Sequence, residues 1–168
     1  MRLVVVGSSA LWPAPELVAN LAALIGSLPP GSEVVTRGKD VLGRTVPINP
    51  LEAAASLLAE EMGYLSRPIV PGWGPSRDTV WRRDYEMIRG AGRVVGFFMD
   101  DADDPMGGGA GHVIHAAMQK GVPCEAWVWT EQGLVNVGSD DGDIEFIPTH
   151  LAGRFQPYPS SVPSGQPW

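Results

Sequence analysis

Short, mostly apolar runs alternate with longer stretches of helical periodicity along most of this sequence. The runs are only a few residues long and are separated by glycine- and proline-containing segments, as buried strands are. They comprise Arg2–Val6, Glu33–Thr36, Pro68–Pro71, Val94–Met99 and Val122–Trp129. Strands that alternate with helices pair in parallel, because each helix carries the chain back across the sheet. We therefore expect an α/β fold: a doubly wound, mostly parallel Rossmann-like sheet with helices on both faces.

The stretches between these runs predict four helices. The best marked begins after Asn49, which can cap it, with Pro50 at the first helical position and Glu52 at the capping-box position. Gly63 suits the residue just beyond its end. The other predicted helices run from Leu17 to Leu28, from Arg77 to Arg89 and from about Val113 to Gly121. Residues 39–48 are polar and lack a clear period, so we expect an irregular loop there.

The C-terminal quarter predicts an antiparallel extension followed by a tail. Glu131-Gln132-Gly133 is typical of a hairpin turn leading into Leu134–Val137, and Ile144–Ile147 predicts a further strand. A chain of 168 residues has the length of one domain. We expect residues 1–150 to form that single domain, with residues 130–150 as the hairpin extension. Residues 151–168 are rich in proline and serine and predict a polyproline-like or disordered tail.

A glycine-rich segment joins the fourth predicted strand to the helix after it. It contains Gly107, Gly108, Gly109 and Gly111. Glycine lets a backbone approach a ligand closely, and the first N–H groups of a helix favour an anion. The segment matches neither the dinucleotide-binding fingerprint after the first strand nor the phosphate-binding P-loop. We predict a phosphate-type site here; the alternative is a flexible loop that needs small residues.

Candidate ligand-binding residues also follow the other parallel strands. Gly7 and Ser8 follow the first strand, Arg37 and Gly38 the second, and Trp73 the third. Right-handed crossovers place the carboxyl ends of parallel strands along one edge, where open α/β sheets bind ligands. We therefore expect these stretches and the glycine-rich segment to share one crevice.

Charged residues near the expected crevice have several interpretations. Arg83 could pair with a phosphate through parallel donors, although helix arginines are often solvated. His112 could donate to a phosphate or ribose hydroxyl, or act as an acid. His115 lies one helical turn further on, so the two histidines could hold a metal, but no acidic spacing nearby matches a calcium loop, and we expect no metal and no cofactor. Glu52 could be a general base, although capping explains it without chemistry.

Composition restricts the partners of the chain. The formal net charge of −7 argues against binding bulk nucleic acid or a membrane surface. Cys124 is the single cysteine, and no apolar run approaches the ~20 residues of a membrane span, so we expect a cytoplasmic protein. The large aromatic residues exceed what a small domain usually buries, which predicts a homodimer or higher homo-oligomer. They are Trp12, Trp81, Trp127, Trp129 and Trp168.

Several short motifs occur together in a fixed order. They are Gly7-Ser8, Arg37-Gly38, Trp73 followed by Arg83-Asp84-Tyr85-Glu86-Met87-Ile88, and Gly109-Ala110-Gly111-His112 ahead of Gly121-Val122-Pro123. In this order and spacing the chain resembles the SLOG superfamily. This Rossmann-like group includes the DNA-processing protein DprA and the LONELY GUY cytokinin-activating enzymes. The likeness is greatest to its small stand-alone YspA-like branch and covers roughly residues 1 to 130.

The resemblance implies a site for nucleotides, nucleotide sugars or related ligands, and adds Asp84 to the candidate ligand-binding residues. The chain also departs from the family. Ser9 stands where many relatives carry arginine, Arg83-Asp84 replaces an Arg-Asn pair, and His112 replaces threonine. His115 stands where the phosphoribohydrolases of the group place a catalytic glutamate. We therefore expect the binding fold without turnover of nucleoside monophosphates to free base.

Three functional hypotheses follow from the sequence. The leading one is binding of a nucleotide or nucleotide-derived small molecule in the glycine-loop crevice. The second is an N-glycosidic hydrolase or transferase that uses Glu52, Asp84 or His112. The third is a phage or mobile-element protein that sequesters a nucleotide signal, because small relatives of this kind are often encoded there.

Overall fold

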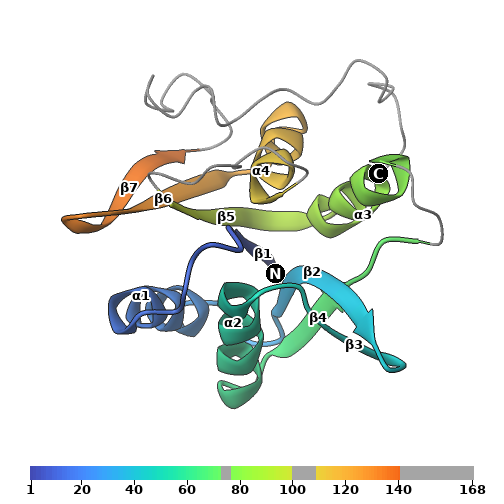
Figure 1. Cartoon of the computed structure of the whole chain (residues 1–168), viewed down its shortest axis with the longest axis horizontal. Coiled ribbons are helices and arrows are strands. Elements are labelled where there is room, and N and C mark those ends of the chain that lie inside the picture. The colour runs from blue at the N-terminus through green and yellow to red at the C-terminus, as the bar shows by residue number, and fades with distance from the viewer. Residues whose placement is uncertain (73–76, 100–108, 141–168) are drawn as a thin grey trace.

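A single mixed β-sheet is the centre of the computed structural model, which describes residues 1–72, 77–99 and 109–140. Helices α1 and α2 cover one face of this sheet, and α3 and α4 cover the other (Figure 1). The elements are β1 (Arg2–Gly7), α1 (Pro15–Gly26), β2 (Glu33–Val41), β3 (Arg44–Pro47), α2 (Pro50–Glu61), β4 (Leu65–Ile69), α3 (Arg77–Ile88), β5 (Ala91–Met99), α4 (Ala110–Gln119), β6 (Cys124–Thr130) and β7 (Gly133–Asp140).

The parallel strands lie in the order β4-β2-β1-β5-β6. Numbered along the chain among themselves, they give the order 3-2-1-4-5 of a Rossmann sheet. The direction of winding reverses between β1 and β5, so the topological switch point lies at the carboxyl ends of those two strands. The predicted doubly wound α/β fold is confirmed. The predicted antiparallel extension is β7, which pairs with β6.

An antiparallel hairpin occupies residues 38–47, where the sequence predicted an irregular loop. That prediction was wrong: β2 continues to Val41 and pairs with β3. At the turn, Leu42 and Gly43 have φ of 50° and 79°, the positive values of a type I′ turn that suits the twist of paired strands. Most of the hairpin beyond Gly38 is exposed on both faces. It therefore lacks the alternation of apolar and polar residues by which a half-buried strand is recognised.

The predicted ends of two helices are confirmed. Asn49 caps α2, because its Oδ1 accepts from the N–H of Glu52 at 2.9 Å. Gly63 (φ 83°) follows the last turn of α2, and its N–H donates to Glu60 O while that of Tyr64 donates to Ala59 O. These two bonds form a Schellman motif. Helix α4 ends in the same way at the predicted Gly121, since Gly121 N–H donates to Met118 O and Val122 N–H to Ala117 O.

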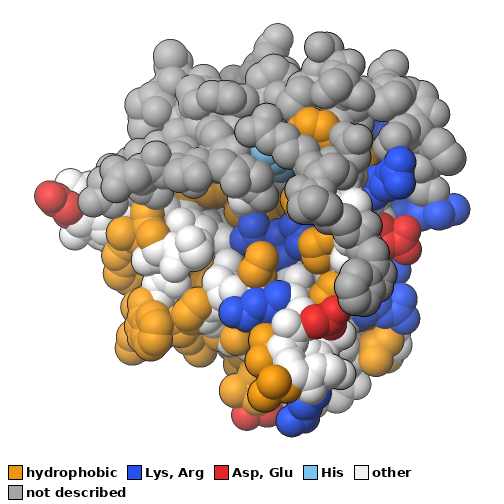
Figure 2. Space-filling view, turned by 45° about the vertical axis from the view of Figure 1, so that its right-hand side comes forward, with side chains coloured by type: hydrophobic (Ala, Val, Ile, Leu, Met, Phe, Trp, Pro, Cys, Tyr) orange, Lys and Arg blue, Asp and Glu red, His pale blue; other side chains and the backbone are white. Residues whose placement is uncertain are grey.

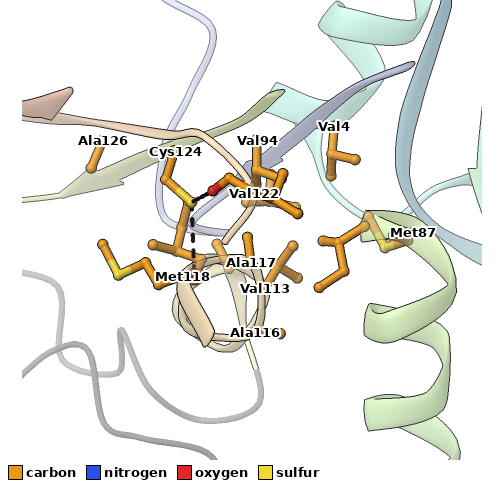
Figure 3. Close-up of a cluster of buried hydrophobic side chains, with 14 of the residues drawn as sticks. Val4, Met87, Val94, Val113, Ala116, Ala117, Met118, Val122, Cys124 and Ala126 are labelled. Carbon is orange, nitrogen blue, oxygen red and sulfur yellow. Dashed lines mark hydrogen bonds between the residues drawn. The ribbon is translucent and has the colours of Figure 1, made fainter. Parts of the chain in front are cut away.

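Two apolar cores lie on opposite faces of the sheet. Figure 3 shows the one beneath α4, where Val113 and Ala117 pack toward Val94 and Met87 approaches from α3. Cys124 is only 2% exposed there, and its Sγ contacts the Val122 carbonyl oxygen at 3.1 Å, so its thiol belongs to the core.

The same core contains Trp81, which is 5% exposed and therefore unavailable for the subunit contact predicted for it. Trp127 and Trp129 pack partly buried against the core on the opposite face, whereas Trp12 is 74% exposed. The aromatic surface that predicted an oligomer is smaller than the sequence suggested. The oligomer itself stays a prediction.

Candidate functional site at the carboxyl edge of the sheet

The guanidinium of Arg37 lies at the carboxyl end of β1, within reach of the N-termini of α2 and α4. Its Nη2 donates to the carbonyl oxygen of Gly7 at 2.6 Å and to the Glu52 carboxylate at 2.6 Å. Its Nε donates to both Glu52 oxygens, at 3.1 and 3.2 Å. Its Nη1 lies 3.8 Å from the point where a Cβ on Gly109 would be. Arg37 is 5% exposed, bonds to Glu52 of α2 and lies near the first residue of α4, the helix on the opposite face of the sheet.

Glu52 is fully buried and accepts hydrogen bonds from three separate segments. Besides the guanidinium, its carboxylate accepts from the N–H of Arg37 at 2.8 Å, the N–H of Gly7 at 3.4 Å and Nδ2 of Asn49 at 2.8 Å. The capping-box interpretation was half correct. Asn49 does cap α2, but the Glu52 carboxylate turns to the ends of β1 and β2 instead of the Asn49 backbone. With both of its oxygens engaged and no exposed surface, Glu52 is poorly placed to act as a general base.

Sequence reasoning missed the wider role of Asn49. Its Nδ2 also donates to the Gly7 carbonyl oxygen at 3.0 Å, so it joins α2 to the end of β1 while its Oδ1 caps the helix. The capping pattern of Asn49 and Glu52 was visible in the sequence. The contacts of Glu52 with Arg37 and Gly7 and of Asn49 with Gly7 are tertiary, since 15 or more residues separate the partners, and no local spacing indicates them.

The two helix N-termini at this edge differ in charge. Helix α2 carries Glu52 in its first turn together with the Asn49 side-chain cap. Helix α4 begins at Gly109 without a side-chain cap and without an acidic residue in its first turn. The positive end of a helix dipole stabilises a negative group nearby. At α2 a carboxylate of the chain supplies that charge, so α4 is the terminus better suited to an external anion.

Helix α1, which follows β1, does not offer the usual phosphate position of a dinucleotide-binding sheet. It begins with Pro15 and carries Glu16 in its first turn. The Glu16 carboxylate also accepts from the N–H of Leu134 in β7 at 3.3 Å. A carboxylate at this helix start repels an incoming phosphate, in agreement with the absence of the dinucleotide fingerprint from the sequence.

The predicted site glycines are glycine for different reasons. A Cβ on Gly7 would lie 1.8 Å from Leu51 Cδ2, so packing accounts for this glycine, and one on Gly38 would lie 3.0 Å from Pro68 Cβ, a tight contact that disfavours a side chain. Gly109 has an extended backbone (φ −93°), and among the described residues its Cβ would meet only Arg37 Nη1, at an ordinary distance. Neither backbone conformation nor packing against the described residues demands glycine at 109. Space for a ligand is therefore one explanation for glycine at this position.

Ser8 lies directly at the switch point. Its N–H donates to the carbonyl oxygen of Phe97 in β5 at 2.9 Å, and its Oγ accepts from the N–H of Ala10 at 3.2 Å. Ser8 is partly exposed, whereas the β1 residues before it are buried. The structure therefore brings Gly7, Ser8, Arg37 and Gly109 to one edge, as the sequence predicted.

Arg83 and Asp84 form a second buried ion pair, within α3. Arg83 is 5% exposed, Asp84 is fully buried, and Arg83 Nε donates to Asp84 Oδ1 at 2.8 Å. Burial of the guanidinium beside this carboxylate excludes the solvated alternative for Arg83, whereas its phosphate contact stays a prediction. Burial, and secondly the charge of Asp84, raise the pKa of the Tyr85 phenol above its usual 10.0.

The remaining predicted site residues divide into two groups. Gly111 is buried in the first turn of α4, and His112 and His115 are partly buried one turn apart on that helix. Trp73, Gly107 and Gly108 lie outside the described residues, as do the aspartates of residues 100–104.

On the face shown in Figure 2, lysine and arginine side chains gather near the centre, below a histidine side chain. Within the described residues, no three histidine, cysteine or acidic side chains come together as a metal site would require. No helix in that part of the chain has both the length and the apolar character needed to cross a membrane.

Comparison with protein-family models, curated proteins and solved structures finds no match to this chain. The strand order places the chain among Rossmann-like α/β folds, and the resemblance to the SLOG superfamily stays a prediction from its motifs.

Proposed function

We propose that this chain binds a nucleotide or nucleotide-derived small molecule at the carboxyl edge of its sheet, with the phosphate at the N-terminus of α4. One observation carries the proposal. Arg37 is buried and fixed at the switch point, with Nη1 directed at Gly109, the helix-start glycine that the described structure does not otherwise require.

The electrostatics of this edge support an anionic group at α4 more than at α1 or α2. Helices α1 and α2 both carry a glutamate in the first turn, whereas α4 carries none. Backbone N–H groups at a helix start and a guanidinium are the donors that proteins commonly use for phosphate. Both kinds of donor occur here within a few ångströms of Gly109.

The nature of the rest of the ligand is proposed from two arguments. Open α/β sheets bind nucleotides in the crevice at the switch point, here between β1 and β5. The resemblance to the SLOG superfamily independently implies nucleotides or nucleotide sugars in that crevice. An N-glycosidic enzyme is less well supported, because the Glu52 and Asp84 carboxylates are buried in pairs with arginines and His115 replaces the family's glutamate.

The proposal is tested by native mass spectrometry of freshly purified protein, followed by calorimetric titration. We expect an adduct with the mass of a nucleotide on the 17.9 kDa chain, or binding of one of three probes. These probes are adenosine monophosphate, a uridine diphosphate sugar and a cyclic dinucleotide. If no nucleotide co-purifies and none of the three binds, the proposal is wrong.

A further inference from the structure

We infer that Glu52 and Asn49 are positioning residues that hold Arg37 in its ligand-facing orientation; this inference rests on the proposed function. Neither side chain needs to touch the ligand for this role. Glu52 is fully buried, and Asn49 is 7% exposed. Glu52 accepts hydrogen bonds from the guanidinium, and Asn49 donates to Glu52 and to Gly7 O, the two groups to which the guanidinium itself donates.

Hydrogen bonds fix one edge of the guanidinium, the edge formed by Nε and Nη2. Nε and Nη2 both donate to Glu52, and Nη2 also donates to the carbonyl oxygen of Gly7. Asn49 Nδ2 donates to that same carbonyl oxygen at 3.0 Å and to Glu52 Oε2 at 2.8 Å, so it holds the two acceptors in place. A guanidinium held along this side cannot rotate without breaking several charged hydrogen bonds. Nη1 is thereby kept on the side of α4.

Stability alone is a weak explanation for this network. A buried ion pair loses so much hydration that its attraction often only offsets the cost, and apolar residues of similar size stabilise a core equally well. Here the network joins β1, β2 and α2 at the edge where Rossmann-like sheets bind ligands. A rigid charged donor at that edge is useful for recognition, because a group already in place loses little conformational freedom when it binds.

The arrangement also restricts the kind of contact that a ligand makes with Arg37. Because Glu52 accepts from the Nε–Nη2 side, a phosphate cannot form the two-pronged contact with that side that arginine often makes. The ligand therefore meets Arg37 through an oxygen at the Nη1 side. The body of the phosphate then lies against the backbone of α4.

Glu52→Gln gives a sharp test because the two possible roles of Glu52 predict opposite changes in the affinity for an anion. If Glu52 mainly neutralises Arg37, removing its charge leaves the edge more positive and an anion binds more tightly. If Glu52 positions Arg37, the guanidinium loses its fixed orientation and binding weakens. We expect affinity to fall about tenfold for whichever of adenosine monophosphate, a uridine diphosphate sugar and a cyclic dinucleotide the wild type binds, as one lost charged hydrogen bond predicts.

Glu33→Gln is the matched control. Glu33 begins β2, the strand that also contains Arg37, and its carboxylate pairs with Arg2 at 2.6 Å at the opposite edge of the sheet. The Glu33 carboxylate also pairs with Arg67 at 3.4 Å, so this variant loses arginine–carboxylate pairs far from the proposed ligand and should bind the probe like the wild type. Melting curves for each variant ensure that titrations are performed where the protein is folded.

Asn49→Ser is the second variant and decides the question if Glu52→Gln does not fold. Serine still caps α2 but lacks the Nδ2 donor, so we expect binding to weaken about threefold with the helix preserved. Unchanged or tighter binding in the folded Glu52→Gln protein overturns the inference while the proposed function stands. If Glu52→Gln is unfolded, unchanged probe binding by Asn49→Ser likewise overturns the inference. If no nucleotide co-purifies with the wild type and it binds none of the probes, the proposed function and the inference both fail.

Discussion

Two buried arginine–carboxylate pairs differ in what surrounds them. Arg37 and Glu52 come from different elements and share their bonds with the end of β1. Arg83 and Asp84 are adjacent in α3 and bond to each other. In both pairs the carboxylate is fully buried, so removing the arginine leaves a negative charge without water and without its cation. The pair in α3 allows this cost to be measured away from the carboxyl-edge network.

We predict that Arg83→Ala lowers the free energy of unfolding by about 3 kcal/mol, because Asp84 stays buried without its cation. Arg82→Ala is the control: its side chain is exposed on the same helix, and its loss should cost no more than about 0.5 kcal/mol. Urea denaturation of both variants gives the comparison. Equal, small losses for the two arginines would show that Arg83 is solvated, as the sequence had suggested.

At the level of elements, the hairpin of β2 and β3 contains a strained position. Leu42 is 98% exposed and has a φ of 50°, a left-handed conformation that costs a leucine about 1–2 kcal/mol. Gly43 follows with positive φ, so the turn has the conformation that Asn-Gly adopts most readily.

Leu42→Asn is therefore expected to raise the free energy of unfolding by about 1 kcal/mol, measured by thermal or urea denaturation. The control is Leu57→Asn in α2, where the leucine is also exposed (57%) but helical. Asparagine is a weak helix former, so that change should cost about 0.5 kcal/mol. A Leu42→Asn protein no more stable than the wild type would contradict the strained turn.

Elements with a buried face could be predicted from the sequence, and those without one could not. The run Val94–Met99 and the helix over Pro50–Glu61 were found because buried side chains and end-capping residues leave local patterns. The exposed hairpin after Gly38 has neither. For the site, local reasoning identified Gly7, Arg37 and Gly109 at one edge. It could not show that Arg83 is buried, because that depends on how α3 packs.

At the scale of the whole molecule, alkaline pH should reveal the buried phenol of Tyr85. Its pKa is raised in the folded state, so folding favours the protonated form. The unfolded chain loses this proton near pH 10, and stability must then fall as the pH rises through the folded pKa. We expect unfolding free energy to be unaffected by Tyr85 below about pH 9 and to decrease above pH 10. Urea denaturation from pH 8 to 11 should show that the unfolding free energy of Tyr85→Phe decreases less steeply with pH than that of the wild type. Equal slopes for the two proteins would show that Tyr85 does not cause the alkaline loss of stability.

The central claim is that the edge formed by β1, β2 and α4 binds a nucleotide-like anion beside Gly109. Gly109→Val tests it most directly, because the extended backbone there (φ −93°) accepts a side chain and the nearest described atom is Arg37 Nη1. The valine methyl groups would occupy the position proposed for the phosphate. The matched control is Gly26→Val, at the far end of α1, where a Cβ meets, among the residues that the structure describes, only Met62 Sδ at 3.9 Å.

The measurement is calorimetric titration of wild type, Gly109→Val and Gly26→Val with the nucleotide that the wild type binds, alongside melting curves. We predict that Gly109→Val weakens binding at least tenfold, about 1.4 kcal/mol, while its stability stays within about 1 kcal/mol of the wild type. Gly26→Val should bind like the wild type. If Gly109→Val binds the nucleotide as tightly as the wild type does, the ligand does not lie at the N-terminus of α4, and the site proposed here is wrong.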